Sequence, residues 1–271
     1  MGTASAVIKR AAVAADRLRP PAAGVTILIY HRVGARTSVS VDLPTALFDE
    51  QVGWLAEHTN VLTLTDAADL LAAGAPPADT RPHVVVTFDD GTADFVDEAL
   101  PVLHRHQVPA TYYLATDFVD RQRPFPDDGQ PMSWGAAEEA VASGLVDIGS
   151  HTHTHALLDR IDAAEAAAEL DRSIATVEDH LGVTPLHFAY PKALLGSPAN
   201  EQEVRRRFRT ATVGRTRTNP WRGSDLHRLT RSPIQTTDGT AYFERKVRGG
   251  MRLENDVRDL VNRWRYRGAT G

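Results

Sequence analysis

Short apolar segments alternate with segments of helical spacing along most of this 271-residue chain. Residues 25–30 (VTILIY), 84–88 (VVVTF) and 110–116 (ATYYLAT) have the length and continuous apolar character of strands buried on both faces. Apolar residues at helical intervals follow, for example in residues 47–58 and 93–106. Strands that alternate with helices favour a parallel sheet or barrel, and six or seven such units are present. We therefore predict one α/β domain.

The two ends of the chain are predicted to be helical. Residues 1–24 form an N-terminal extension in which Ala6–Leu18 is predicted to be a short helix, ended by an Arg-Pro-Pro sequence. Residues 25–271 form the main domain, with a last long helix near Tyr242–Tyr266. Charged residues interrupt the apolar start, so it lacks the continuous apolar segment of a secretory signal. We therefore expect a cytoplasmic location.

Composition excludes several classes of protein. The net charge is −5 and no basic stripe is present, so we expect no nucleic-acid partner. No uninterrupted apolar segment approaches the roughly 20 residues that span a bilayer, so we expect no transmembrane segment. The chain has no cysteine, and any metal must be bound by His, Asp or Glu. The oligomeric state is not predicted.

Two adjacent carboxylates, Asp89 and Asp90, directly follow the segment 84–88. Successive side chains on an extended strand face opposite ways, so both reach one pocket only if the backbone turns, which Gly91 permits. In one pocket they would repel each other and raise one pKa unless a cation lay beside them. A metal with one Asp as ligand and the other as base is one interpretation. An ordinary turn with an Asp helix cap is the alternative.

A cluster of three histidines follows a later predicted strand, in the sequence GSHTHTH. On an extended strand His151 and His155 would stand about 13 Å apart, too far to share an ion. In a helical or tight-turn geometry they approach to about 6 Å, which suits two imidazoles on one metal. His153 then points elsewhere. Beside an Asp-Asp-Gly sequence, this spacing favours metal binding over isolated surface histidines.

Three motifs carry a family resemblance: TFDDG (Thr87–Gly91), SHTHTH (Ser150–His155) and FAYP (Phe188–Pro191). In this order they resemble the successive motifs of the NodB-type polysaccharide deacetylases, carbohydrate esterase family 4. The resemblance extends over about residues 25 to 235 and implies a distorted (β/α)7-type barrel with mostly parallel strands. It also implies a divalent metal, usually Zn²⁺, held by an Asp-His-His triad.

Carried over position by position, the resemblance makes Asp90, His151 and His155 the metal ligands and Asp89 the general base. The activity implied is hydrolysis of an N-acetyl group on an N-acetylated sugar, in an oligosaccharide, polysaccharide or glycoconjugate, with release of acetate and an amine. Two alternatives remain open: a deacylase of another amide, ester or imide, and a carbohydrate-binding relative that has lost turnover.

The general acid is the less determined part of the implied site. In the family it is a late histidine at the end of a strand, and here the late candidate His227, in DLHRL, follows no apolar strand. His31 does end one, in ILIYHRVG, which resembles the opening of the permuted branch that deacetylates poly-N-acetylglucosamine. We therefore assign the acid to His31, with His227 as the alternative.

The third motif departs from the family pattern. Ala189 stands where most members have an arginine that orients the base, and Lys192 stands where an aromatic residue is usual. The residue that orients Asp89 is therefore open, with Lys192 as one candidate and a solvated lysine as the alternative. The resemblance also implies that the backbone N–H near Lys192 binds the oxyanion. Tyr190 and Trp134 are candidates for a substrate-binding wall, with ordinary packing as the alternative.

Overall fold

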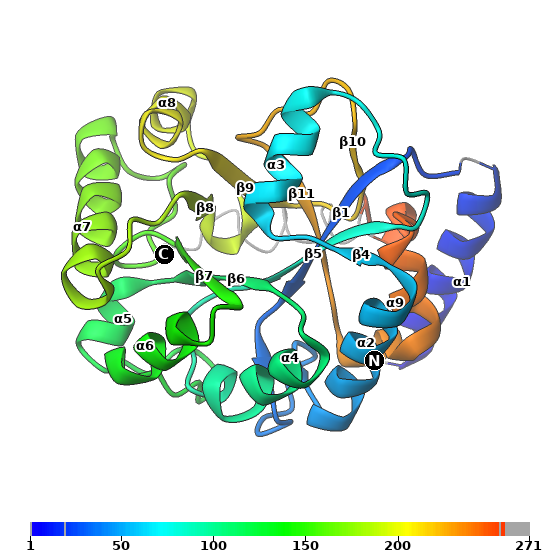
Figure 1. The fold of residues 1–271 in the computed structure, drawn as a ribbon, viewed down its shortest axis with the longest axis horizontal. Coiled ribbons are helices and arrows are strands. Elements are labelled where there is room, and N and C mark those ends of the chain that lie inside the picture. Colours follow the sequence, from blue (N-terminus) through cyan, green and yellow to red (C-terminus); the bar gives the residue numbers. More distant parts are fainter. Residues whose placement is uncertain (1, 19, 255, 258–271) are drawn as a thin grey trace.

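The computed structural model describes residues 2–18, 20–254 and 256–257, and its centre is a closed barrel of parallel strands (Figure 1). The seven barrel strands are β1 (Gly24–Tyr30), β5 (His83–Phe88), β6 (Ala110–Leu114), β7 (Val146–Ser150), β8 (His187–Ala189), β9 (Thr210–Gly214) and β11 (Leu229–Pro233). The barrel closes because β1 pairs with both β5 and β11. The predicted α/β barrel is thereby confirmed.

Four short strands complete the described strands. β4 (Asn60–Val61) runs parallel to β5, and β10 (Asn219–Pro220) runs antiparallel to β1. β2 (Arg32–Val33) and β3 (Asp42–Leu43) form a separate parallel pair just after β1. The segment that leaves the end of β1 is therefore held in a defined path.

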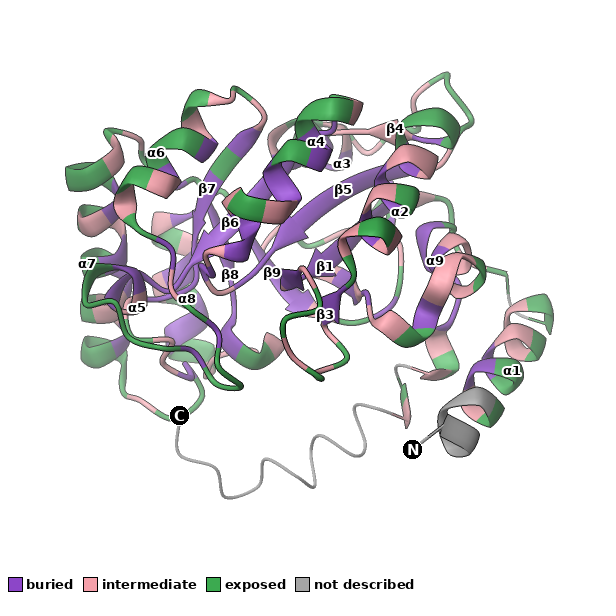
Figure 2. Ribbon diagram, turned by 90° about the horizontal axis from the view of Figure 1, so that it is seen from below, coloured by how far each residue is buried: buried purple, intermediate pink, exposed green. Residues whose placement is uncertain are grey.

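The continuous apolar strands are explained by burial on both faces. All six residues of β5 are buried, and Figure 2 shows the barrel strands in the colour of buried residues beneath partly exposed helices. Val84 and Val86 belong to one hydrophobic cluster and Val85 to another, as expected when successive side chains point to opposite faces. β1 shows the same alternation. Neither strand can therefore carry a charge before its end.

Helices surround the barrel. They are α2 (Thr45–His58), α3 (Leu64–Ala73), α4 (Leu100–His106), α5 (Thr116–Asp120), α6 (Trp134–Ala142), α7 (Ala163–Leu181), α8 (Pro198–Arg207) and α9 (Gly239–Val247), with single turns η1 (Phe95–Ala99), η2 (Pro191–Ala193) and η3 (Thr236–Asp238). The predicted helix 93–106 divides into the π-turn η1 and α4. Pro101 lies at this junction and has no N–H to donate to an α-helical hydrogen bond.

The N-terminal extension is a helix, α1 (Gly2–Leu18), that is attached to the domain by a buried charge. Lys9 is 2% exposed, and its Nζ contacts Asp238 and lies 2.8 Å from Glu254 Oε1. Lys246 of α9 lies 2.7 Å from the other oxygen of Asp238. Two lysines and two carboxylates therefore neutralise one another between α1, η3 and the chain after α9.

The predicted last helix over 242–266 is interrupted in its described part. α9 ends at Val247, and the chain then turns through Gly249 (φ 77°) and Met251 (φ 68°), backbone angles that no α-helix contains. Residues 252–254 and 256–257 are helical again, while residues 255 and 258–266 of that prediction lie outside the described residues. Among the described helices, none combines the length and apolar character needed to cross a membrane.

Candidate active site

The residues predicted to carry chemistry meet at one edge of the barrel, where the parallel strands end. β1 and β5 are in register at Tyr30 and Phe88, so His31 and Asp89 leave their strands side by side. The Asp89 N–H donates to the Tyr30 carbonyl at 3.1 Å. His151 follows β7 at the same edge, which is where barrel enzymes place their active sites.

The backbone turns sharply at the Asp pair. Asp90 has φ 84° and Gly91 has φ 114°, so the turn begins one residue earlier than the glycine alone indicated. A Cβ at position 91 would lie 3.1 Å from Val119 Cγ2 and 3.3 Å from Leu114 Cδ2, tighter than ordinary packing. The turn sends the two carboxylates to different partners.

Asp90 faces two of the three histidines. Its Oδ1 lies 3.7 Å from His151 Nε2 and 3.7 Å from His155 Nε2. The ligand atoms of the three residues all lie within 4.8 Å of one another. The segment after β7 is neither strand nor helix, and residues in the left-handed region at Thr152 (φ 63°) and His155 (φ 61°) bring the rings together. Of the two geometries considered for these histidines, the tight turn is the one observed.

The donor set of Asp90, His151 and His155 fits a divalent cation. His151 Nδ1 lies 2.7 Å from the Ala189 carbonyl, and a hydrogen bond there leaves Nε2 free to ligate. Burial lowers the pKa of His151, and burial together with the nearby His151 lowers the pKa of His155 to about 3. Burial raises the pKa of Asp90, but three nearby histidines outweigh it and the pKa is lowered. Two neutral imidazoles and a carboxylate form a candidate metal centre.

His153 is turned away from this centre. Its Nδ1 lies 2.9 Å from Thr116 Oγ1, and its Nε2 lies 3.7 Å from Asp117 Oδ1. Asp117 is held in turn by Arg121 at 2.9 Å. Neither ring nitrogen of His153 therefore faces this centre.

Asp89 is bound on both oxygens by a residue that the sequence analysis missed. Arg231 Nη1 lies 2.6 Å from Asp89 Oδ1 and Arg231 Nη2 lies 2.8 Å from Oδ2. Burial raises the pKa of Asp89, but the charge and hydrogen bonds of Arg231 overcome it and lower the pKa to about 2. Asp89 is therefore an ionised carboxylate with a fixed orientation.

A signal for this arginine was present in LTRSP, where one charged residue interrupts a strand. Arg231 is fully buried in β11 and also donates to Thr87 Oγ1 at 3.0 Å. It contacts Asp89 in the way expected of the missing arginine in the third motif. The interpretation of Lys192 as that residue is wrong: Lys192 is exposed, and its charge acts on His155.

Of the two candidate acids, His31 is the one at this edge of the barrel. Its Nδ1 is buried and has no hydrogen-bond partner among the described residues, and its charge helps to lower the pKa of Asp90. His227 lies two residues before the start of β11, at the opposite edge, and its Nε2 donates to the Phe208 carbonyl at 2.8 Å. The geometry therefore separates His227 from the candidate active site.

The predicted substrate-binding wall is partly wrong. Tyr190 is fully buried and packs edge-on against Phe188, with ring centroids 5.0 Å apart, so it offers no surface to a sugar. Trp134 is half-buried, and one face of its ring stacks on His180 at 4.2 Å. Lys192 lies in the turn η2 in the left-handed region, with φ 53°. Of these three predicted residues, Lys192 is the one whose side chain is exposed.

The polar insertion over residues 121–131 is anchored next to the site. Arg32, the neighbour of His31, donates to the Asp127 carbonyl at 2.7 Å and to the Pro126 carbonyl at 2.5 Å. Phe118 connects the insertion to the candidate centre: its ring stacks on Phe125 at 4.5 Å and meets His155 edge-on at 6.4 Å. The insertion therefore forms a rim of the candidate active site.

Comparison with known proteins agrees with this geometry. A model of the polysaccharide deacetylase family matches residues 77–207, which include the Asp pair and the histidine cluster. The chain is 32% identical over 112 residues to a poly-beta-1,6-N-acetyl-D-glucosamine N-deacetylase of Staphylococcus epidermidis, covering 41% of this chain and 37% of that protein. It is 27% identical over 143 residues to the protein of the same name from Escherichia coli K12, covering 49% of this chain and 21% of that protein. The chain thus spans less than half the length of these curated relatives.

Solved structures share the fold. The deacetylase PplD of Streptococcus pyogenes superposes with a TM-score of 0.73 at 19% identity, covering 83% of this chain and 99% of that one. IcaB from Ammonifex degensii superposes with a TM-score of 0.71 at 25% identity, covering 83% of this chain and 98% of that one. The barrel is therefore similar over nearly the whole of both structures.

Proposed function

Because this chain belongs to the polysaccharide deacetylase family, we propose that it is a metal-dependent hydrolase that removes the N-acetyl group from an N-acetylated sugar. The reaction adds water across the amide: the C–N bond breaks, acetate forms and the sugar retains a free amine. The observation that carries the proposal is the candidate metal centre beside a carboxylate that Arg231 holds ionised.

Each residue at this edge of the barrel has a place in the reaction. Asp90, His151 and His155 would hold a divalent cation, most simply Zn²⁺ given two nitrogen donors and one oxygen donor. When bound, such an ion supplies Lewis-acid polarisation of the acyl oxygen and of water. Asp89 accepts the proton of the attacking water on a carboxylate oxygen, because Arg231 keeps it ionised.

His31 supplies the second proton transfer. As an imidazolium it donates a proton to the nitrogen of the breaking C–N bond. This proton is needed because an unprotonated amine is a poor leaving group at neutral pH. His31 and Asp89 follow adjacent, in-register strands, so the acid and the base are held by one rigid part of the barrel. The backbone N–H near Lys192 is the proposed donor to the tetrahedral oxyanion.

The names of the two poly-beta-1,6-N-acetyl-D-glucosamine N-deacetylases support a β-1,6-linked N-acetylglucosamine oligosaccharide as the first substrate to test. Acetate release from this oligosaccharide would be measured after zinc is supplied, with a chitooligosaccharide as the comparison. Asp89→Asn and His31→Gln should each lower kcat by at least about a hundredfold, the usual contribution of a general base or acid. Asp97→Asn, on an exposed carboxylate of η1, is the matched control and should leave kcat unchanged.

Circular dichroism would verify that each variant is folded. Acetate release that survives in folded Asp89→Asn would contradict the proposed base. A zinc-loaded wild type that releases no acetate from either oligosaccharide would contradict the proposed substrate class.

A further inference from the structure

The N-terminal helix α1 presents one fixed face to solvent. Lys9 on its inner face is held by Asp238 and Glu254, and Asp16 accepts a hydrogen bond from the Met251 N–H at 2.7 Å. These contacts lie near the middle and at the end of the helix, so α1 cannot rotate about its axis without breaking one of them. The same face of α1 therefore points away from the rest of the described chain.

That outer face is apolar. Val7 is 65% exposed and Leu18 is 85% exposed, the two largest values among the exposed large hydrophobic residues described. Ala11 and Ala14 are also exposed. At about 100° per residue, these four side chains fall within an arc of roughly 60° on the helix surface. We call this set the outer stripe of α1, and it has no packing partner in the described part of the chain.

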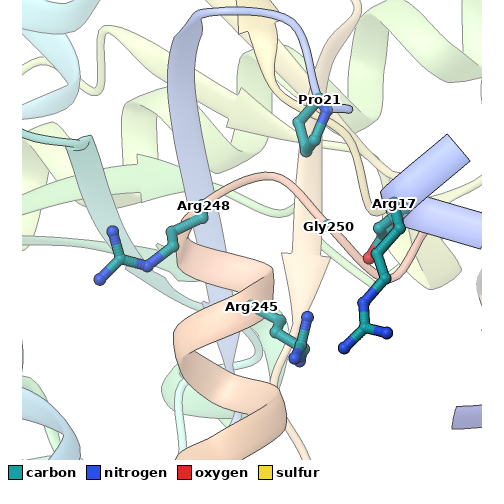
Figure 3. A pocket seen from close by; sticks show the side chains of 6 residues that line it. Arg17, Pro21, Arg245, Arg248 and Gly250 are labelled. Atoms are coloured by element: carbon teal, nitrogen blue, oxygen red, sulfur yellow. The ribbon is translucent and has the colours of Figure 1, made fainter. Parts of the chain in front are cut away.

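Arginines without a carboxylate partner among the described residues lie next to the outer stripe. An open hollow of about 220 Å³ separates the end of α1 from α9, and it is lined by Arg17, Arg245 and Arg248 together with Asp16, Pro21 and Gly250. Figure 3 shows the guanidinium groups of Arg17 and Arg245 extending to the same side of the α9 ribbon, while Arg248 extends away from them. Arg248 lies over the Trp54 ring at 5.6 Å.

None of these three arginines has an ion pair with a carboxylate within the described residues, although most other described arginines do. Asp16, the acidic residue that lines the hollow, is engaged by the Met251 N–H. Arg10, also exposed, lies on the same side of the outer stripe as Arg17. A concentration of positive charge stands here on a chain whose net charge is −5.

We propose that the outer stripe of α1 and the arginine-lined hollow dock this protein on an anionic lipid surface. An apolar helix face bordered by arginines inserts shallowly at the level of the lipid headgroups, while the guanidinium groups bind lipid phosphates. A soluble polyanion would use the arginines but would gain nothing from Val7 and Leu18. A symmetric dimer through this face would bring the same arginines toward one another, which like charges disfavour.

The test is sedimentation with vesicles, and it does not depend on the proposed enzymatic function. The full chain is mixed with vesicles of phosphatidylglycerol and phosphatidylcholine, or of phosphatidylcholine alone. Binding to the anionic vesicles that weakens with salt is expected, with little binding to the neutral ones. The double variant Arg17→Gln/Arg245→Gln should weaken binding about 30-fold, because each arginine near an anionic surface contributes about fivefold.

The second variant, Val7→Ser/Leu18→Ser, should weaken binding at least about tenfold through loss of apolar burial. The matched control is Arg172→Gln/Leu186→Ser. Arg172 lies on α7, which Figure 1 places at the other end of the molecule from α1, and Leu186 follows that helix and is 48% exposed. This control should bind within twofold of wild type.

Several results would overturn the docking surface. They are equal binding to both vesicle types, no binding to either, or equal losses in the control and the two test variants. Light scattering that shows a dimer which Val7→Ser/Leu18→Ser converts to a monomer would assign the outer stripe to a second copy. Calorimetry that shows saturable binding of inorganic phosphate without any vesicle binding would make the hollow a site for a free anion.

Discussion

Replacement of Arg231 tests whether this buried residue sets the state of Asp89. In Arg231→Lys the charge remains but the two-pronged contact, at 2.6 and 2.8 Å, is lost. In Arg231→Met the charge is lost as well, and Asp89, 5% exposed, becomes an unpaired buried carboxylate. Breaking a buried pair in this way costs about 3–5 kcal/mol. We therefore expect Arg231→Met to lose that much free energy of unfolding, and Arg231→Lys to lose less.

The direction of the pH effect follows from the pKa of Asp89, which Arg231 holds at about 2, below the usual value of 3.8 for an aspartate. A carboxylate whose pKa is lower in the folded than in the unfolded protein stabilises the fold at pH values above its pKa in the unfolded protein. This stabilisation is lost as the pH falls through its pKa in the folded protein. The difference between the two pKa values corresponds to about 2 kcal/mol of folding free energy. Weaker contacts in Arg231→Lys should raise the pKa of Asp89. The kcat of this variant should therefore begin to fall at a higher pH than that of wild type, whose Asp89 stays ionised throughout the measured range.

The assay combines acetate release from pH 4 to pH 9 with urea unfolding at pH 7. Arg231→Lys should remain folded and lose about ten- to a hundredfold in kcat, because the carboxylate is no longer aimed. Arg207→Lys is the control, since Arg207 makes a similar two-pronged contact with Asp171, between α8 and α7 and outside the candidate centre. A wild-type kcat in Arg231→Lys that begins to fall at the same pH as in wild type would refute the reasoning.

Two further substitutions test the buried ion pairs that attach α1 and the anchoring of the insertion 121–131. Lys9→Met should lower the free energy of unfolding by about 3 kcal/mol in a urea titration, because it leaves two buried carboxylates short of a partner. Arg10→Met, on the exposed face of α1, is the control and should change the free energy of unfolding by less than about 0.5 kcal/mol. Equal effects of the two would contradict the buried pairing. Gly129→Ala should raise KM for the oligosaccharide several-fold, because the added Cβ would lie 2.2 Å from Arg32 Nη2 and displace the insertion. Gly135→Ala is the control and should leave KM unchanged, because its added Cβ would lie 3.9 Å from the nearest atom, Ser133 Oγ. An unchanged KM would show that the insertion does not contact substrate.

Local motifs made much of the candidate site predictable from the sequence. His151 directly follows the buried strand β7, and Asp90 lies two residues after the end of β5. Parallel strands end at the same edge of a barrel, so the meeting of these residues needed only the correct fold class. The four-residue spacing of His151 and His155 left an extended and a turned geometry open. The left-handed angle at Thr152, which no sequence rule predicts for a β-branched residue, settled it.

Long-range contacts were the part that could not be predicted. Arg231 is 142 residues from Asp89, and the two meet only because β1 lies between β5 and β11 in the closed barrel. Tyr190 was misassigned because an apolar segment does not show which face of its strand meets the core. The predicted end of α9 lies too far along the chain, because the apolar spacing was given more weight than Gly249 and Gly250, which interrupt it.

The central claim is that Asp90, His151 and His155 hold one divalent ion, and metal content measured after zinc reconstitution and dialysis tests it most directly. Wild type and His153→Ala should each retain about one zinc per chain, because His153 faces Thr116 and Asp117. Asp90→Ala and His151→Ala should each lose it while remaining folded, because two ligands seldom hold zinc. Zinc retained by Asp90→Ala, or absent from wild type, would contradict the account.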